Sequence, residues 1–232
     1  MKEVQGAIKS LQAGKTPGPD GLPTEFYKSN LEVIGPHLHS MLNAALERRS
    51  LPASMMEAVI VVIPKPGKDP ELCSSYRPIS LLNVDAKILT KILANRLNTV
   101  ILTLIHGDQT GFMPGKGTDI NIRRLHTNIA IFREQNTAGA VASLDAEKAF
   151  DSVEWAFLWR VLTKFGFGPK FIEWIKLLYG SPTARVSTGG SVSAPFQLCR
   201  GTRQGCPLSP GLFALAIEPM AIMLRSTHEA WR

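Results

Sequence analysis

The chain has 232 residues, of which 44% are hydrophobic, enough to bury a sizeable core as one large domain or two small ones. It carries 26 Lys and Arg against 19 Asp and Glu, a net charge of +7 that favours an anionic partner such as nucleic acid, although a merely basic soluble protein has the same balance. Its start lacks a signal-peptide core and no apolar stretch is long enough to span a bilayer, which argues against secretion and membrane insertion. A nuclear or cytoplasmic location remains, and the sequence does not choose between them.

Hydrophobic periodicity predicts three helices in the first half of the chain, over residues 2–11, 24–49 and 85–105. We expect Pro36 to break or kink the second of these helices, because proline removes a backbone donor. The β-branched run Ala58–Ile63 ends in a Pro- and Gly-containing turn, which predicts a buried strand.

The second half mixes strands and helices in the same way. Residues 140–144 predict a strand ending at Asp145, and two short runs around Gly189 and Gly190 predict a hairpin. Helices are predicted over residues 153–165, 171–179 and 209–225, the last kinked or locally opened by Pro219. No stretch of linker composition divides the chain, and the predicted fold class is α+β.

Asp145 is the first candidate for chemistry. A carboxylate at the end of a buried strand needs compensation, and Mg²⁺ prefers carboxylate and phosphate oxygens. The alternative is a helix N-cap, which is the more common role of Asp at a strand end. Spacing alone leaves both readings open.

Two further passages contain residue types that suit a nucleotide. Residues 201–210 are rich in Gly and Pro, so that the backbone, Arg203 and Gln204 could approach a ligand, or the passage is simply a tight turn into a helix. Lys65 and Arg77 lie on flanking loops and could grip a triphosphate, or they are solvated charges.

Five passages occur together in the order and spacing of one family. They read KTPGPDGLPTEFYK, VVIPKPGKDPELCSSYRPISLLNVDAKILTKILANRL, DQTGFMPGKGTDINIRRL, SLDAEKAFDSVEW and GTRQGCPLSPGLFALAIEP. Together they resemble the reverse transcriptase domain of non-LTR (LINE-type) retrotransposons along nearly the whole chain. The wording of the last two fits group II intron maturases less well.

The resemblance implies a right-hand polymerase fold. Residues 1–125 would form a fingers-like region and residues 126–232 a partial palm-like region, with the thumb absent. The implied partners are an RNA template with a DNA primer, or an RNA/DNA duplex, together with deoxynucleotides and Mg²⁺.

The resemblance also implies a role for individual residues. Asp145 would be the catalytic Mg²⁺ ligand and Phe150 the steric gate against ribonucleotide 2′-hydroxyls. The residues expected near the sugar are Gln204 and Gly205, and those on the triphosphate are Lys65 and Arg77. The loop around residues 109–117, which includes Gln109 and Gly111, would approach the template, with Arg123 nearby. Asp151 also matches a family position, where we expect it to hold the loop or helix start rather than a metal.

The family's Asp-Asp palm motif has no counterpart in this sequence. The chain contains no Asp-Asp dipeptide, and no Asp follows Asp151. Polymerases use two metal ions about 3.5 to 4 Å apart, and one carboxylate cannot position both. We therefore expect a reverse transcriptase fragment without useful activity of its own. The alternatives are a non-catalytic RNA or RNA/DNA-binding module and a fragment that another chain completes.

Overall fold

A computed structural model describes residues 1–229 of the chain and leaves residues 230–232 undescribed. The first half contains α1 (Lys2–Ser10), α2 (Thr24–Ser29), α3 (Leu31–Arg48), α4 (Ala53–Met56), β1 (Glu57–Pro64), the 3-10 turn η1 (Cys73–Ser75), β2 (Tyr76–Leu82), α5 (Val84–Asn98) and α6 (Ile101–Leu104). The second half contains α7 (Asp119–Glu134), α8 (Ala149–Ser152), α9 (Trp155–Lys164), α10 (Pro169–Leu178), β3 (Thr183–Thr188), β4 (Ser191–Val192), β5 (Phe196–Gln197) and α11 (Ser209–Glu229). This mixture of helices and strands confirms the α+β class.

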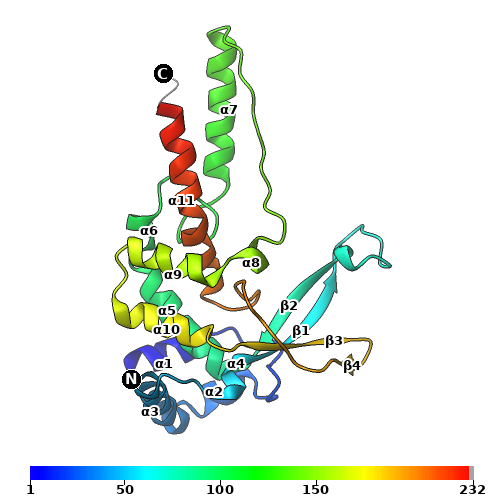
Figure 1. The fold of residues 1–232 in the computed structure, drawn as a ribbon, viewed down its shortest axis with the longest axis vertical. Helices are drawn as coiled ribbons and strands as arrows, with labels where there is room; N and C mark the ends of the chain where they lie inside the picture. The colour runs from blue at the N-terminus through cyan, green and yellow to red at the C-terminus, as the bar shows by residue number, and fades with distance from the viewer. Residues whose placement is uncertain (230–232) are drawn as a thin grey trace.

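One small sheet joins the two halves of the chain. Strand β1 pairs with β2 in antiparallel register and with β3 in parallel register, and β3 also pairs with β4 and β5. The hairpin of β1 and β2 projects away from the helices (Figure 1). The prediction of a buried strand here was wrong in its burial: only Ala58 of β1 is buried, because the hairpin leaves the helical layer as it extends.

The core lies around α5. This helix buries nine residues, among them Ile88, Leu93 and Leu97, and it contacts α1, α4, α6 and α11. Helices α9 and α10 add amphipathic faces that include Leu158 and Ile175, both fully buried. Burial of such side chains stabilises the fold by about 1.5 to 3 kcal/mol each. The helices predicted over residues 2–11, 153–165 and 171–179 are confirmed as α1, α9 and α10.

Two predicted helices are interrupted at positions that the periodicity did not reveal. The first break falls at Asn30, whose side-chain amide donates to the Phe26 carbonyl at 2.8 Å, and α3 then continues through Pro36. The second falls at Thr99, whose hydroxyl donates to the Arg96 carbonyl at 2.7 Å and so competes with the helical pattern between α5 and α6. In contrast, α11 runs through Pro219 as one helix.

The predicted strand at residues 140–144 is absent. Residues 138–146 instead run exposed and without regular structure from the end of α7 towards α8 (Figure 1), with Val141 65% and Leu144 80% exposed. Within residues 1–229 no strand lies beside this segment, so Val141 and Leu144 lack the cross-strand partners that a strand requires. The expectation that Asp145 ends a buried strand was therefore wrong.

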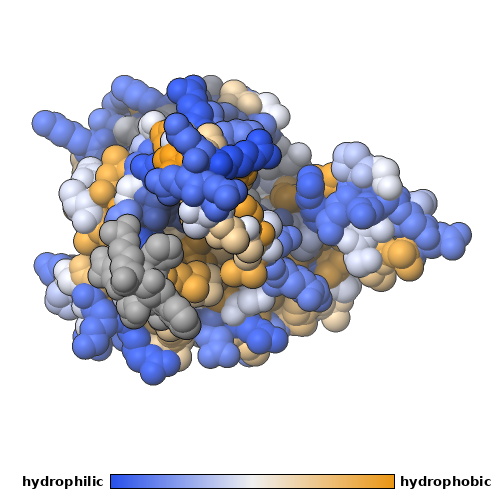
Figure 2. All heavy atoms as spheres, turned by 90° about the horizontal axis from the view of Figure 1, so that it is seen from above, coloured by the Kyte–Doolittle hydropathy of each residue, from blue (hydrophilic) through white to orange (hydrophobic). Residues whose placement is uncertain are grey.

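Helix α7 was not predicted. It buries none of its residues, and Ile122, Leu125 and Phe132 are among its exposed apolar side chains. Figure 2 shows hydrophobic patches between hydrophilic side chains at this end of the molecule. None of the helices in the described residues is both long and apolar enough to cross a membrane.

Candidate functional site

A hollow of about 870 Å³ lies between the β1–β2 hairpin, the turn before α8 and the loop before α11. Six residues to which the family resemblance assigned a metal- or nucleotide-binding role line it together: Lys65, Arg77, Asp145, Phe150, Gln204 and Gly205. They come from segments up to 140 positions apart, so the fold gathers them. Polar and charged groups converging in one hollow are typical of a small-molecule site.

Two cations lie on the hairpin side of the hollow. The Lys65 ammonium donates to the Ser74 carbonyl at 2.8 Å, and the Lys65 backbone N–H donates to the Ser75 carbonyl at 2.8 Å. Arg77 is exposed on β2, opposite Ile63 of β1. In the described part of the chain neither cation forms an ion pair with a carboxylate. Both charges are therefore available to an anion in the hollow.

Carboxylates lie across the hollow from these cations. Asp145 is exposed in the irregular segment and does not cap α8, whose N-cap residue is Lys148. Burial raises the pKa of Asp151, and Lys148 opposes this rise in part. Among the residues that the structure describes, no three His, Cys, Asp or Glu side chains lie close enough together to hold a metal ion. The residues present thus do not fit a two-metal centre.

The loop before α11 is held against the back of Phe150. The Gly201 N–H donates to the Val153 carbonyl at 2.8 Å, and the Thr202 N–H donates to the Phe150 carbonyl at 2.7 Å. The Trp155 indole N–H donates to the Gly201 carbonyl at 2.9 Å. These bonds fix the turn that carries Phe150 relative to the next wall of the hollow.

Gly205 makes a close approach to β2. Its φ is +105°, and a Cβ built there would lie 2.7 Å from the Ser80 carbonyl oxygen, so only glycine fits. The Ser80 N–H in turn donates to the Gln204 carbonyl at 2.9 Å. The backbone of Gln204 and Gly205 is therefore fixed at the floor of the hollow.

Arg203, which the sequence suggested for ligand contact, also lines the hollow, but its guanidinium is held by the protein. Its Nη2 donates to the Met56 carbonyl at 2.8 Å, and its buried Nε has no hydrogen-bond partner in the described residues. Burial lowers the pKa of this guanidinium. Its main contact therefore links the loop to the start of β1.

Two aromatic rings, those of Phe112 and Phe150, line one side of the hollow, and a third, Phe213, packs against Phe150. Phe150 stacks on Phe213 of α11 with ring centroids 4.9 Å apart and an interplanar angle of 27°. Phe112 meets Phe150 edge to face, with centroids 5.7 Å apart at 80°. No sequence pattern points to Phe112 individually, although it directly follows Gly111 in the loop expected near the template. Only the fold places it on this wall.

The three predicted template residues do not line the hollow. Gln109 and Gly111 lie in the loop between α6 and α7, and the Gln109 carbonyl accepts a bond from the Lys116 ammonium at 3.5 Å. Arg123 is exposed on α7 and pairs with Asp119 at 3.2 Å. These residues thus lie apart from the six that the hollow brings together.

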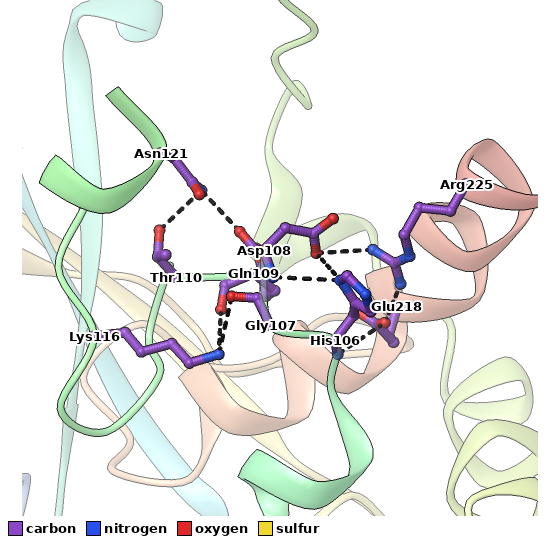
Figure 3. Close-up of polar contacts among 9 residues, drawn as sticks. All are labelled: His106, Gly107, Asp108, Gln109, Thr110, Lys116, Asn121, Glu218 and Arg225. Carbon is purple, nitrogen blue, oxygen red and sulfur yellow. Dashed lines mark hydrogen bonds and ion pairs between the residues drawn. The ribbon is translucent and has the colours of Figure 1, made fainter. Parts of the chain in front are cut away.

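The α6–α7 loop is clamped to α11 by charged groups (Figure 3). Arg225 donates to the Asp108 carboxylate at 3.0 Å and also to the Glu218 carboxylate. The His106 N–H donates to Glu218 at 3.3 Å, while the His106 ring lies 2.8 Å from Asp108. Burial opposes the charge of Asp108, but His106 and Arg225 outweigh it and the pKa of Asp108 is lowered.

Helix α7 and the loop itself add further hydrogen bonds that hold the loop. The Asn121 amide donates to the Asp108 carbonyl at 2.8 Å and to the Thr110 hydroxyl at 3.1 Å. The Lys116 ammonium donates to the Gly107 carbonyl at 3.2 Å. We call the four side chains of His106, Asp108, Glu218 and Arg225 the charged clamp.

Known proteins resemble this chain over almost its full length. The family described as reverse transcriptase (RNA-dependent DNA polymerase) matches residues 63–230. A transposon TX1 uncharacterized 149 kDa protein of Xenopus laevis is 38% identical over 97% of this chain and 17% of its own length. A retrovirus-related Pol polyprotein from a type-1 retrotransposable element R2 of Popillia japonica is 32% identical over 97% of this chain and 31% of its own.

A further relative is the RNA-directed DNA polymerase from mobile element jockey of Drosophila melanogaster, 31% identical over 95% of this chain and 24% of its own length. The chain thus spans less than a third of each of these three relatives. The family match covers well over half of the chain, and the relatives come from retroelements. The chain therefore belongs to the reverse transcriptase family, in the form found in non-LTR (LINE-type) retrotransposons.

Proposed function

We propose that the hollow binds a deoxynucleoside triphosphate and that the chain forms the nucleotide-holding part of a retroelement reverse transcriptase. The observation that carries the proposal is the convergence of Lys65, Arg77, Phe150 and Gln204 on one hollow. The partners would be an RNA template with a DNA primer, or an RNA/DNA duplex. The net charge of +7 suits such polyanions.

The two cations would hold the triphosphate. Lys65 offers a compact ammonium charge, and Arg77 offers a planar fork that matches two phosphate oxygens at once. Because the Lys65 ammonium already donates to Ser74, it is held at the hairpin tip with donors to spare. The triphosphate would therefore lie along the hairpin side of the hollow.

The opposite walls would hold the sugar. Phe150 is fixed from behind by Phe213, so its ring cannot withdraw easily from a group placed against it. A 2′-hydroxyl at that position would meet the ring, which is the basis for a gate against ribonucleotides. Gln204 and Gly205 would face the sugar from the floor, where the absence of a Cβ at Gly205 keeps the backbone near β2.

Mg²⁺ is the metal expected for this family, and Asp145 is the ligand we propose for it. The described residues do not supply a complete site, since no group of three potential ligands occurs among them. We therefore propose nucleotide binding without efficient polymerisation by this chain alone. Glu147 and Asp151 also line the hollow, but among the described residues they belong to no group of three potential ligands.

We also propose that residues 1–125 are the fingers-like region and residues 126–232 the palm-like region. Strands β1 and β2 come from the former and β3 from the latter, so the shared sheet would hold the two regions together. Lys65 and Arg77 would then reach the nucleotide from the fingers, and Asp145, Phe150 and Gln204 from the palm.

Nucleotide binding tests this proposal directly. Equilibrium dialysis with radiolabelled dATP should show that Lys65→Ala and Arg77→Ala each weaken binding about 10-fold or more, as loss of a charged hydrogen bond of roughly 1.5 to 3 kcal/mol predicts. Lys68→Ala is the matched control, because Lys68 is on the same hairpin tip but does not line the hollow. Equal effects of all three variants would contradict the proposal.

Primer extension on poly(rA)/oligo(dT) with Mg²⁺ tests the second part. We expect no extension by the purified chain. Extension that Asp145→Asn abolishes would show that further carboxylates complete the centre. Salt-sensitive RNA binding without dATP binding would instead favour the RNA-binding module.

A further inference from the structure

Phe112 has an unusual backbone conformation for a large side chain. Its φ is +61°, and the residue is 56% exposed. Bulky residues rarely adopt positive φ, and such strain persists only where the surroundings impose it. A strained backbone that presents an exposed aromatic ring points to a function for that ring.

A hydrogen-bonded turn holds Phe112 in this conformation. The Met113 N–H donates to the Thr110 carbonyl at 3.3 Å and closes the turn around Phe112. Thr110 is itself buried, and its hydroxyl accepts the Asn121 amide of α7. The turn is therefore attached to the start of α7.

The charged clamp attaches the same loop to α11 (Figure 3). Glu218 is 1% exposed, and Arg225 connects it to Asp108 on the loop. Removing Arg225 would leave a buried carboxylate without its charge partner, an arrangement that proteins avoid. The loop is thus held by two helices, and Phe112 cannot relax freely into solvent.

The ring is directed to the hollow proposed for the nucleotide. Phe112 lines it together with Arg77, Lys65 and Phe150, and it meets Phe150 edge to face. One wall of the hollow is therefore aromatic, while the hairpin side is cationic. Flat apolar rings and phosphate groups are the two parts of a nucleotide that these walls would satisfy.

From this geometry we propose that Phe112 stacks on or packs against a nucleobase in the hollow. The inference rests on the proposed nucleotide-binding function and assigns the base to one residue of a loop for which the sequence predicted only a general approach to the template. The base can belong to the incoming nucleotide or to an unpaired template strand. Asp108, Asn121 and Arg225 are positioning residues that hold the ring in place.

The test compares ligands that differ only in the base. Binding of dATP and of inorganic tripolyphosphate is measured for wild type, Phe112→Leu and Phe112→Tyr, each with a thermal melt to show that it folds. We expect Phe112→Leu to weaken dATP binding about 5- to 100-fold without changing tripolyphosphate binding, since base–aromatic stacking has this strength. Phe112→Tyr should bind dATP about as well as wild type, because it keeps the aromatic face.

A second arm tests the template source. A single-stranded oligoribonucleotide is compared with an abasic strand of the same length. A loss by Phe112→Leu confined to dATP assigns the base to the incoming nucleotide, and a loss confined to the base-bearing strand assigns it to the template. Either result supports the inference.

Four results would overturn it. Unchanged binding of both dATP and the base-bearing strand in Phe112→Leu, or equal loss of dATP and tripolyphosphate, would overturn the inference alone and leave the proposed function standing. Failure of Phe112→Tyr to retain binding would do the same. No binding of dATP, tripolyphosphate or RNA by wild type would overturn both this inference and the proposed function.

Discussion

Helices α5 and α7 are almost equal in length, at 15 and 16 residues, but they differ in their surroundings. Helix α5 buries nine residues in the core, whereas α7 buries none. Both contain apolar residues along their length, so composition does not distinguish them. One end of this molecule is therefore stabilised by packing and the other by a few specific polar contacts.

The largest expected effect comes from truncating an isoleucine side chain in α5, and the same truncation in α7 is the comparison. Ile88→Ala in α5 should lower the free energy of unfolding by about 2 to 5 kcal/mol, because Ile88 is fully buried and leaves a cavity. Ile122→Ala in α7 should change it by less than about 0.5 kcal/mol, since Ile122 is 54% exposed. Urea unfolding measures both, and equal losses would mean that α7 is packed in solution.

Two arginines give the next comparison. Arg225→Ala should destabilise the chain by about 1 to 3 kcal/mol, since it leaves the buried Glu218 carboxylate without its charge partner. Arg96→Ala breaks an exposed pair with Glu3 on the packed side and should cost at most about 1 kcal/mol. Urea midpoints with the two costs reversed would argue against the charged clamp.

Acid should loosen the clamp through Asp108. Its lowered pKa means that its ionised form stabilises the fold at pH values above the ordinary Asp value of about 3.9. This stabilisation is lost as the pH falls below that value and through the lowered pKa. Urea midpoints of wild type and Asp108→Asn should differ at pH 6, and the difference should shrink as the pH falls below the ordinary Asp value towards the lowered pKa. A constant difference would mean that another group controls the loop.

The smallest effect is expected on the exposed surface of α7. Arg123→Ala removes an i, i+4 pair with Asp119 in which both side chains are mostly exposed. Such pairs contribute about 0.3 to 0.5 kcal/mol, and the difference should vanish at high salt. If Arg123 contacts the template, the same variant will weaken RNA binding much more than it affects stability, and the two measurements separate these roles.

Much of the packed end follows from local patterns. Helices α1, α9 and α10 and the hairpin of β3 with β5 agree with the periodicity because each has one apolar face and a clear turn at its end. The six residues of the hollow were also identified, through their residue types and the resemblance to one family. Local physics and family motifs were sufficient there.

The projecting end shows where such reasoning stops. Residues 140–144 have strand-forming composition, but a strand exists only if another strand pairs with it, and sequence periodicity does not report the partner. Helix α7 has no buried face for periodicity to detect. The breaks at Asn30 and Thr99 depend on single side-chain hydrogen bonds, which window averages do not resolve.

The sequence by itself determined the fold class, most of the core helices, the family and the chemical types of the site residues. Only the tertiary structure decided that Lys65, Phe150 and Gln204 share one hollow, that Arg225 reaches Asp108 across 117 positions, and that Phe112 joins the wall. The physical reason is the separation along the chain of the residues that interact. Helix periodicity and turn chemistry act within a few residues, whereas a site and a clamp arise from contacts that close long loops and exist only after the chain has packed.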